Sequence, residues 1–159
     1  MAEERNDDRA IVMTREFDAP RQLVWDAWTQ PQHVAQWWGP NGFTNTIHEM
    51  EVKPEGVWRF TMHGPDGRDW PNRIVFREIV EPERLVYDHS DDLPEPTTRF
   101  HVTVTFEELG SRTRLTMRSL FPSAEELRRV VEENGAVEGA KQHLERLRQH
   151  LTTMEVQHV

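Results

Sequence analysis

Histidine is the residue type in this sequence with the widest choice of chemistry. The chain has eight His, and imidazole is a common ligand for zinc and similar ions. Neither His-x-x-x-His nor His-Glu-x-x-His occurs, and His143 and His150 are expected on the solvent-exposed face of a predicted helix. We therefore predict neither a metal site nor a cofactor.

Acid–base chemistry is a second possibility, because several ionisable residues fall on predicted strands whose side chains could enter a cavity. They are Glu49, Glu51, Asp88, His48, His89 and Arg73. His48, His89 and His101 could converge, but their facing depends on strand register, which one sequence does not fix. A cyclase- or hydrolase-like enzyme with His48, Asp88 or His89 as acid or base therefore stays an alternative.

Nucleophilic catalysis finds little support. The sequence has no Cys, no Gly-x-Ser-x-Gly elbow and no glycine-rich phosphate loop. The absence of Cys also removes disulfides and thiolate metal sites.

Aromatic residues give the strongest indication of a binding site. Six Trp and seven Phe stand against one Tyr, and such side chains suit both cores and the walls of apolar cavities. Trp37 and Trp38 are adjacent, so on a helix at least one should face away from the core, toward a rim or a cavity mouth. The candidate cavity residues are Trp37, Trp38, His48, Met50, Trp58, Phe60, Met62, Trp70, Tyr87, His89, Phe100, Val102 and Leu144, with a plain core position as the alternative for each aromatic.

The elements that must position these residues follow from hydrophobic periodicity and turn signals. A first strand is expected over Ala10 to Phe17, then a short helix opened by Pro20 and a second opened by Pro31. A period of two then predicts strands at Phe43 to Val52, Val57 to His63, Asn72 to Val80, Leu85 to His89, Thr98 to Leu109 and Thr113 to Leu120, with a loop from Ser90 to Pro96.

The remaining C-terminal part of the chain has helical periodicity. Pro122-Ser123 followed by Glu125-Glu126 indicates a helix start, and Asn134-Gly135 a break before a long final helix that continues to about Met154. The final helix carries an apolar stripe of Val137, Ala140, Leu144, Leu147 and Leu151. Because a sheet with one apolar face needs a cover, we predict an α+β fold in which a curved antiparallel sheet wraps around this helix.

Length and charge limit the other assignments. The 159 residues fit one domain, expected over residues 9–154, with a disordered tail at 1–8 and a C-terminal tail at 155–159. A net charge of −9 argues against nucleic acid and anionic membranes as partners. No apolar run approaches the roughly 20 residues of a membrane span, and the N-terminus lacks an apolar signal core, so a cytoplasmic location is expected.

Four segments of the chain resemble a known family. They are FDAPRQLVWDAWTQPQHVAQWWGPNGFT at residues 17–44, VKPEGVWRFTMHGPDGRDWP at 52–71, PERLVYDHS at 82–90 and EGAKQHLERLRQHL at 138–151. Together they are similar to the activator of heat-shock-protein-90 ATPase-like proteins, in the START and birch-pollen-allergen superfamily with the helix-grip fold. The Trp37-Trp38-Gly39-Pro40 stretch and the Pro-x-Gly-x-Trp-x-Phe pattern at 54–60 are the most specific parts.

The resemblance implies a cavity between sheet and helix that takes a small apolar or amphipathic molecule. We predict a small-molecule-binding protein of this kind, with the enzyme described above as one alternative. A co-chaperone or other protein-interaction domain is another alternative, with the acidic surface and an exposed Trp37 or Trp38 as contact features. In the family, co-chaperone activity belongs to longer proteins with an additional domain. A homodimer is also possible.

Overall fold

Seven strands form one antiparallel sheet in the computed structural model, which describes residues 9–92, 94 and 99–157. The order across the sheet is β1-β7-β6-β5-β4-β3-β2, so β1 and β2 are its two edges. The strands are β1 (Ala10–Phe17), β2 (Thr44–Met50), β3 (Val57–His63), β4 (Asp69–Val80), β5 (Arg84–Asp91), β6 (Arg99–Leu109) and β7 (Arg112–Leu120). The helices of the described residues are α1 (Arg21–Thr29), α2 (Pro31–Trp37), α3 (Ala124–Asn134) and α4 (Ala136–Gln157).

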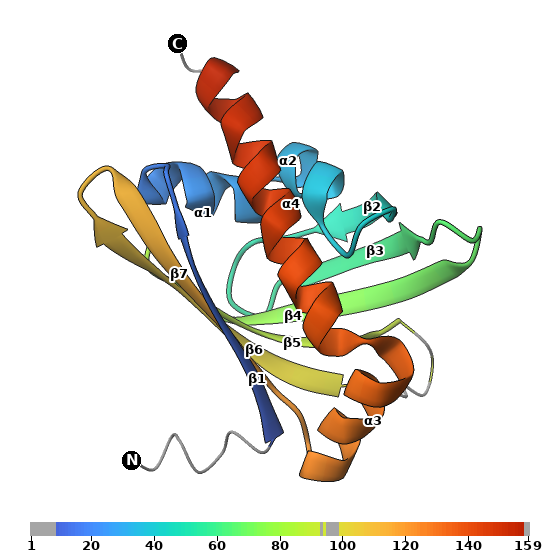
Figure 1. Ribbon diagram of the computed structural model, residues 1–159. Coiled ribbons are helices and arrows are strands. Elements are labelled where there is room, and N and C mark those ends of the chain that lie inside the picture. Colours follow the sequence, from blue (N-terminus) through green and yellow to red (C-terminus); the bar gives the residue numbers. More distant parts are fainter. Residues whose placement is uncertain (1–8, 93, 95–98, 158–159) are drawn as a thin grey trace.

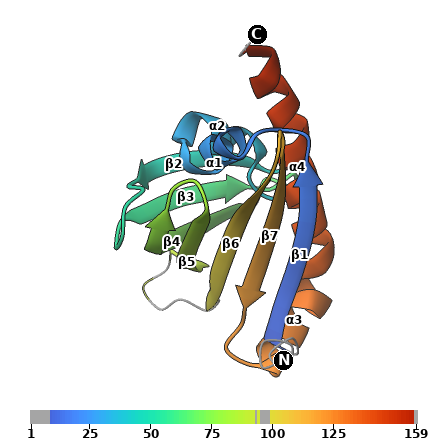
Figure 2. The same cartoon turned by 90° about the vertical axis from the view of Figure 1, so that its left-hand side faces the viewer.

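The sheet curls, and α4 runs across one side of it (Figure 1). From β2 to β7 the strands form a meander, and β1 completes the sheet by pairing with β7. Seen from the side, α1 and α2 lie over one end of the curl and α4 lies beside β1 (Figure 2). This arrangement confirms the predicted α+β helix-grip fold.

Strand positions follow the alternation of the sequence, because successive side chains of a strand point to opposite faces. Trp58 and Phe60 of β3 are buried, as are Val102 and Val104 of β6. The predicted strands at Ala10–Phe17 and Val57–His63 have the predicted bounds.

Other strand bounds differ from the predictions at one or both ends. Strand β4 begins at Asp69 rather than Asn72, because Asp69 and Trp70 still pair with His63 and Met62 of β3. Strand β5 continues to Asp91, so the predicted loop begins later than Ser90. The predicted start of β6 at Thr98 lies outside the described residues, as do parts of that loop.

The predicted break in the C-terminal helical region is confirmed. The hydroxyl Oγ of Ser123 accepts a hydrogen bond from the backbone N–H of Glu126 at 3.1 Å, which caps α3 at its N-terminus. Gly135 ends α3 in the left-handed conformation, with φ of 62°, which costs glycine little. Helix α4 then reaches Gln157, so the predicted tail boundary at 155 falls inside this helix.

Replacing Ser123 by alanine tests the cap. We expect the free energy of unfolding to fall by about 1 kcal/mol, because the Glu126 N–H loses its acceptor. Urea denaturation monitored by circular dichroism measures this change. Ser123→Asp, which keeps an acceptor, is the matched control and should retain most of the stability; equal losses in both variants would contradict the capping role.

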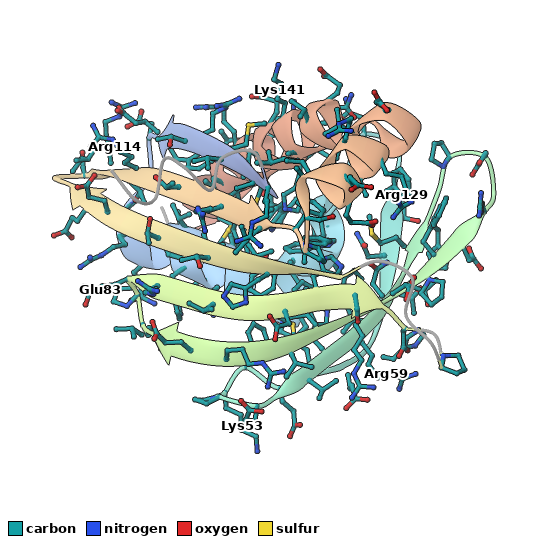
Figure 3. The ribbon with its side chains drawn as sticks, turned by 90° about the horizontal axis from the view of Figure 1, so that it is seen from below. Lys53, Arg59, Glu83, Arg114, Arg129 and Lys141 are labelled. Carbon is teal, nitrogen blue, oxygen red and sulfur yellow. The ribbon has the colours of Figure 1, made fainter. Side chains whose placement is uncertain are left out.

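Charged side chains cover the outside of this fold. Lys53, Arg59, Glu83, Arg114 and Lys141 point away from the body of the protein in Figure 3. They come from the sheet, its turns and α4, so the surface charge is spread over several elements.

The apolar stripe of α4 is confirmed, but the predicted position of its two histidines is wrong. Leu144, Leu147 and Leu151 are buried in the core. His143 and His150, expected on a solvated face, are also buried, with exposures of 8% and 9%. The reason is that α4 packs against α2 and the segment after it as well as against the sheet, so it buries a wider arc than its leucines mark.

Candidate functional site

A pocket of about 230 Å³ lies between α4 and the inner face of the sheet. Its walls come from β1, β3, β5, β6 and β7, from the segment after α2, and from the first half of α4. The lining residues are Ile11, Trp38, Gly39, Pro40, Met62, Tyr87, His89, Phe100, Val102, Met117, Ser119, Phe121, Gly135, Ala136, Gly139, Ala140 and His143.

The pocket exists because the two halves of α4 carry side chains of different size. The first half presents Gly139 and Ala140 to the pocket. The second half presents Leu144, Leu147 and Leu151 to the core, where they are fully packed. Gly139 and Ala140 are too small to fill the space between the helix backbone and the sheet, so the hollow lies under the first half of α4.

Aromatic rings form much of the wall. Trp38 packs edge-on against Trp58 with ring centroids 4.7 Å apart, and Phe100 stacks on Phe121 at 5.0 Å. These contacts fix the rings in place, since paired aromatic side chains gain energy beyond simple burial. The resulting wall is apolar and rigid, which suits a flat apolar ligand.

His143 enters this apolar wall from α4. Its ring contacts the indoles of both Trp37 and Trp38, with centroid distances of 4.8 and 4.5 Å. Its Nδ1 accepts a hydrogen bond from the backbone N–H of Gly39 at 2.9 Å. Burial lowers the pKa of His143 to about 3, with smaller contributions from the charges of Arg146 and His89. The imidazole is therefore neutral at physiological pH, and its proton is on Nε2.

His89 enters the pocket from β5 and is held by Asn72 of β4. The His89 Nε2 lies 2.8 Å from the Asn72 side-chain oxygen, and the Asn72 amide nitrogen donates to the Trp70 carbonyl at 2.9 Å. The second bond fixes the orientation of the amide, so Nε2 of His89 is the donor and Nδ1 carries no proton. Burial lowers the pKa of His89 to about 4, an effect that the charge of Asp91 partly offsets.

Two hydroxyl groups complete the polar lining. Tyr87 is buried, and burial raises the pKa of its hydroxyl, which the nearby Trp28 indole partly offsets. Ser119 of β7 is buried as well. The described residues that line the pocket include no carboxylate and no ammonium or guanidinium group, so every polar group there is neutral at pH 7.

Arg146 holds the segment that forms one wall. Its two terminal nitrogens lie 2.8 to 3.2 Å from five backbone carbonyl oxygens. These carbonyls belong to Gln36, Trp38, Gly39, Pro40 and Phe43. The peptide that joins Trp38 to Gly39 donates its N–H to His143 and accepts from Arg146 through the Trp38 carbonyl. Its orientation is therefore fixed, which in turn fixes the protonation of the His143 ring.

A larger pocket, of about 610 Å³, lies at the end of strands β5 to β7 and extends onto the outer face of the sheet. Its polar residues are largely paired: Asp88 accepts from Arg77 and contacts His101, each at 2.7 Å. Burial works to raise the pKa of Asp88, but the bonds from His101 and Arg77 outweigh it, and the pKa is lowered. Size alone would favour this pocket, but its charged and water-exposed lining does not favour an apolar ligand.

The structure brings together part of the set of candidate cavity residues. Trp38, Met62, Tyr87, His89, Phe100 and Val102 line the inner pocket. Ligand contact by these residues stays a prediction. They come from four separate elements, which the sheet register places around one space.

The other candidates lie elsewhere. Trp37, Trp58, Phe60 and Leu144 are core residues behind the lining, and Met50 packs against the core. His48 is exposed and bonds to the Thr61 hydroxyl at 2.8 Å. Trp70 is 40% exposed and lies under the Arg68 guanidinium at 4.0 Å.

Neither Trp37 nor Trp38 is turned toward solvent, but Trp38 lines the pocket, as expected for a residue of the pair that faces a cavity. Both are buried, with exposures of 1% and 4%. Helix α2 ends at Trp37, and Trp38 has extended backbone angles, so the helical geometry that separates adjacent side chains does not apply to this pair. Neither indole is therefore exposed as the protein-interaction alternative requires.

The acid–base candidates do not converge. Glu49 and Arg59 are paired on the exposed face at 3.2 Å, and His48 is on that face too. Asp88 follows Tyr87 on β5 and so points to the opposite side of the sheet from the pocket. Of the candidate acids and bases, His89 alone lines the inner pocket among the described residues, and no group of three or more metal-ligating side chains is found in that part of the chain.

Sequence reasoning did not select the small residues of α4, Ser119 and Phe121, or His143 as lining. Glycine and alanine at 135, 136, 139 and 140 follow a helical spacing of three and four, which was the available signal. No comparable signal exists for Phe121, because it follows the end of β7.

Comparison with known proteins agrees with the fold. Residues 18–152 match the family described as activator of Hsp90 ATPase homolog 1-like protein, and the chain belongs to this family. This confirms the family resemblance. No curated protein gives a significant match.

Several solved structures are similar over almost the whole chain. A protein from Arthrobacter aurescens, solved by NMR, is 29% identical with a TM-score of 0.87, covering 93% of this chain and 88% of that one. The crystal structure of protein Ms6760 from Mycobacterium smegmatis is 26% identical with a TM-score of 0.80, covering 90% of each chain. The AHSA1 protein of Silicibacter pomeroyi shares the fold at 19% identity, with a TM-score of 0.72 and coverage of 91% of this chain and 99% of that one.

No helix within residues 9–92, 94 and 99–157 is both long enough and apolar enough to cross a bilayer.

Proposed function

We propose that this protein binds a small, largely apolar molecule in the pocket between α4 and the sheet. The observation that carries the proposal is the lining itself: a pocket of about 230 Å³ with apolar walls, interrupted by the buried imidazole of His143 and the part-buried imidazole of His89, both neutral. Purely structural interiors are packed to the density of organic crystals, whereas binding pockets combine apolar area with a few polar groups.

The size of the pocket limits the ligand. An apolar cavity of about 150 Å³ accepts benzene, so about 230 Å³ fits a substituted single ring or a small bicyclic compound. Burial of such a ring provides the binding energy, at roughly 25 cal/mol for each Å² of apolar surface removed from water.

Binding is favoured over acid–base catalysis by the state of the polar groups. His89 and His143 have pKa values of about 4 and 3, so neither donates or takes up a proton readily near pH 7. No carboxylate among the described residues lines the pocket to assist them. The groups can orient a ligand, but they are poorly matched to proton transfer.

Ala140→Leu is the variant that tests the pocket as a binding site. Its longer side chain should fill the space next to His143, so binding of apolar ring compounds such as p-xylene and naphthalene should weaken at least tenfold. Ligand-induced chemical-shift changes in two-dimensional NMR, with thermal shift as a second readout, measure this loss.

Lys141→Leu is the matched control, because it adds a leucine at the neighbouring exposed position and leaves the pocket unchanged. It should bind the probes like the unaltered protein. The proposal would be overturned if no compound of this size bound the unaltered protein, or if Ala140→Leu bound the probes as well as the control.

A further inference from the structure

The two histidines of the pocket have opposite hydrogen-bonding roles. His143 accepts from the Gly39 N–H through Nδ1, so its Nε2 carries the proton. His89 donates to Asn72 through Nε2, so its Nδ1 carries the lone pair. One neutral ring is thus left with a spare donor and the other with a spare acceptor, both on side chains that line the same pocket.

Both spare groups lack a partner within the part of the chain that the structure describes. Among the described residues, the His143 ring forms a hydrogen bond with Gly39 alone, and the His89 ring with Asn72 alone. The fully enclosed, unbonded side-chain atoms of the described residues are Arg21 Nε, Trp28 Nε1, Asn45 Oδ1 and Trp58 Nε1, so neither spare nitrogen is sealed off. Both nitrogens belong to rings that line the pocket, and the His89 ring borders the larger pocket as well.

The roles are locked by the surrounding structure. The peptide that joins Trp38 to Gly39 cannot turn to offer its carbonyl to His143, because that carbonyl, of Trp38, accepts from Arg146 and from the Asn45 side-chain amide, each at 3.0 Å. The Asn72 amide cannot flip, because its nitrogen donates to the Trp70 carbonyl. A change of tautomer in either ring would place a donor against a donor or an acceptor against an acceptor, which is costly in a buried site.

We infer that the pocket selects a neutral ring compound bearing an amide-like group, whose carbonyl accepts from His143 Nε2–H and whose N–H donates to His89 Nδ1. This inference rests on the proposed function and specifies its ligand class. A carboxylate of the same shape is excluded, because no cationic side chain among the described residues lines the pocket to balance a buried negative charge.

Four para-substituted toluenes separate the contributions: p-xylene, 4-methylacetophenone, 4-methylbenzamide and 4-methylbenzoate, of which the last three have nearly equal shape. They carry no polar group, an acceptor, an acceptor with a donor, and a negative charge. At pH 7.5 each satisfied hydrogen bond should strengthen binding about fivefold to tenfold, giving the order amide, ketone, hydrocarbon. The benzoate should bind at least a hundredfold more weakly than the amide.

Two variants test which histidine forms which hydrogen bond to the ligand. His143→Leu should weaken the ketone and the amide about fivefold to tenfold and leave p-xylene unchanged. His89→Leu should weaken the amide by the same factor and leave the ketone and p-xylene unchanged. His150→Leu is the control, because His150 also lies on α4 and is buried but does not line the pocket.

A measurement on the unaltered protein does not depend on whether these variants fold. Long-range ¹H–¹⁵N NMR should show both rings as neutral Nε2–H tautomers, and 4-methylbenzamide should shift the His143 Nε2–H and His89 Nδ1 signals more than p-xylene does. Equal affinity for the three neutral probes, tight binding of the benzoate, or the other tautomer in either ring would overturn the inference while the proposed function stands. Failure of all four probes, p-xylene included, would instead overturn the proposed function.

Discussion

Replacing Arg146 by leucine is expected to lower the free energy of unfolding by about 3 kcal/mol, although leucine is a good helix former. The guanidinium bonds five backbone carbonyls of the segment from Gln36 to Phe43 and has no carboxylate partner among the described residues. Burial lowers the pKa of Arg146, which shows that its charge has already been partly removed from water. Removing the guanidinium leaves the Gly39 carbonyl without a donor among the described residues, while the Trp38 and Pro40 carbonyls keep their bonds from Asn45 Nδ2 and the Phe43 N–H. The site is part-buried, and the lost hydrogen bonds dominate the expected change.

Urea denaturation gives the size of this effect, and two variants define its cause. Arg146→Lys should lose about half as much, because one ammonium with three donors replaces a planar fork with five. Lys141→Leu, on the exposed face of the same helix, should change stability by less than about 0.5 kcal/mol. A loss in Arg146→Leu no larger than that in Lys141→Leu would show that the carbonyl contacts contribute little.

Most of the fold follows from local patterns in the sequence. The strand from Val57 to His63 is marked by alternation and by the turns on each side, and its bounds match the prediction. The break at Gly135 is marked because the residue there needs a positive φ. Such features depend on nearest neighbours along the chain, so a single sequence contains the information.

Local sequence patterns could not show whether the polar side chains of α4 point to the protein interior or to solvent. His143, Arg146 and His150 alternate with exposed charged residues, and a polar stripe normally indicates solvent. Their partners are the Gly39 peptide, a set of carbonyls and His33, whose Nδ1 lies 3.1 Å from His150 Nε2. Backbone partners leave no signature in the sequence, and these ones lie about a hundred residues away.

The pocket was predicted in its place but only partly in its lining. The cover by the last helix and the inward row of aromatics placed a hollow between them. Whether Trp58 or Tyr87 borders that hollow depends on which sheet residues lie opposite Gly139 and Ala140. This in turn depends on the position of α4 along the sheet. That position is a tertiary property, so Trp58 and Phe60 proved to be core while Phe121 joined the lining.

Lowering the pH from 7.5 to 5 is expected to remove about 3 kcal/mol of stability through His89 and His143. Their pKa values are about 4 and 3 in the folded protein, against the ordinary value of 6.5 in the unfolded chain. Between these limits the unfolded chain binds more protons than the folded one, so stability rises with pH and is lost as the pH falls below 6.5. Each fully excluded imidazole contributes roughly 1.4 kcal/mol per pH unit, hence about 2 kcal/mol at pH 5, and the partial exposure of His89 reduces the sum for the pair.

The pH chosen separates the imidazoles from the carboxylates. The pKa of Asp88 is lowered by folding, so its contribution is present above about pH 4 and is lost only as the pH falls through its folded value. The pKa of His150 is lowered by burial and by the charge of His33, which adds a loss of the same sign over the same range as the pocket pair. His150→Gln therefore measures the loss of stability due to His150. His89→Gln and His143→Gln should each reduce the slope of the free energy of unfolding against pH by the equivalent of about one proton.

Urea titrations at several pH values, at low protein concentration because the isoelectric point is near 5.4, give this slope directly. Stability that is the same at pH 7.5 and pH 5, or an NMR titration of the His143 ring with a midpoint near 6.5, would contradict a buried neutral imidazole. A pocket whose His143 titrates normally would also admit water and anions, so the same titration tests the electrostatic basis on which the ligand class was assigned.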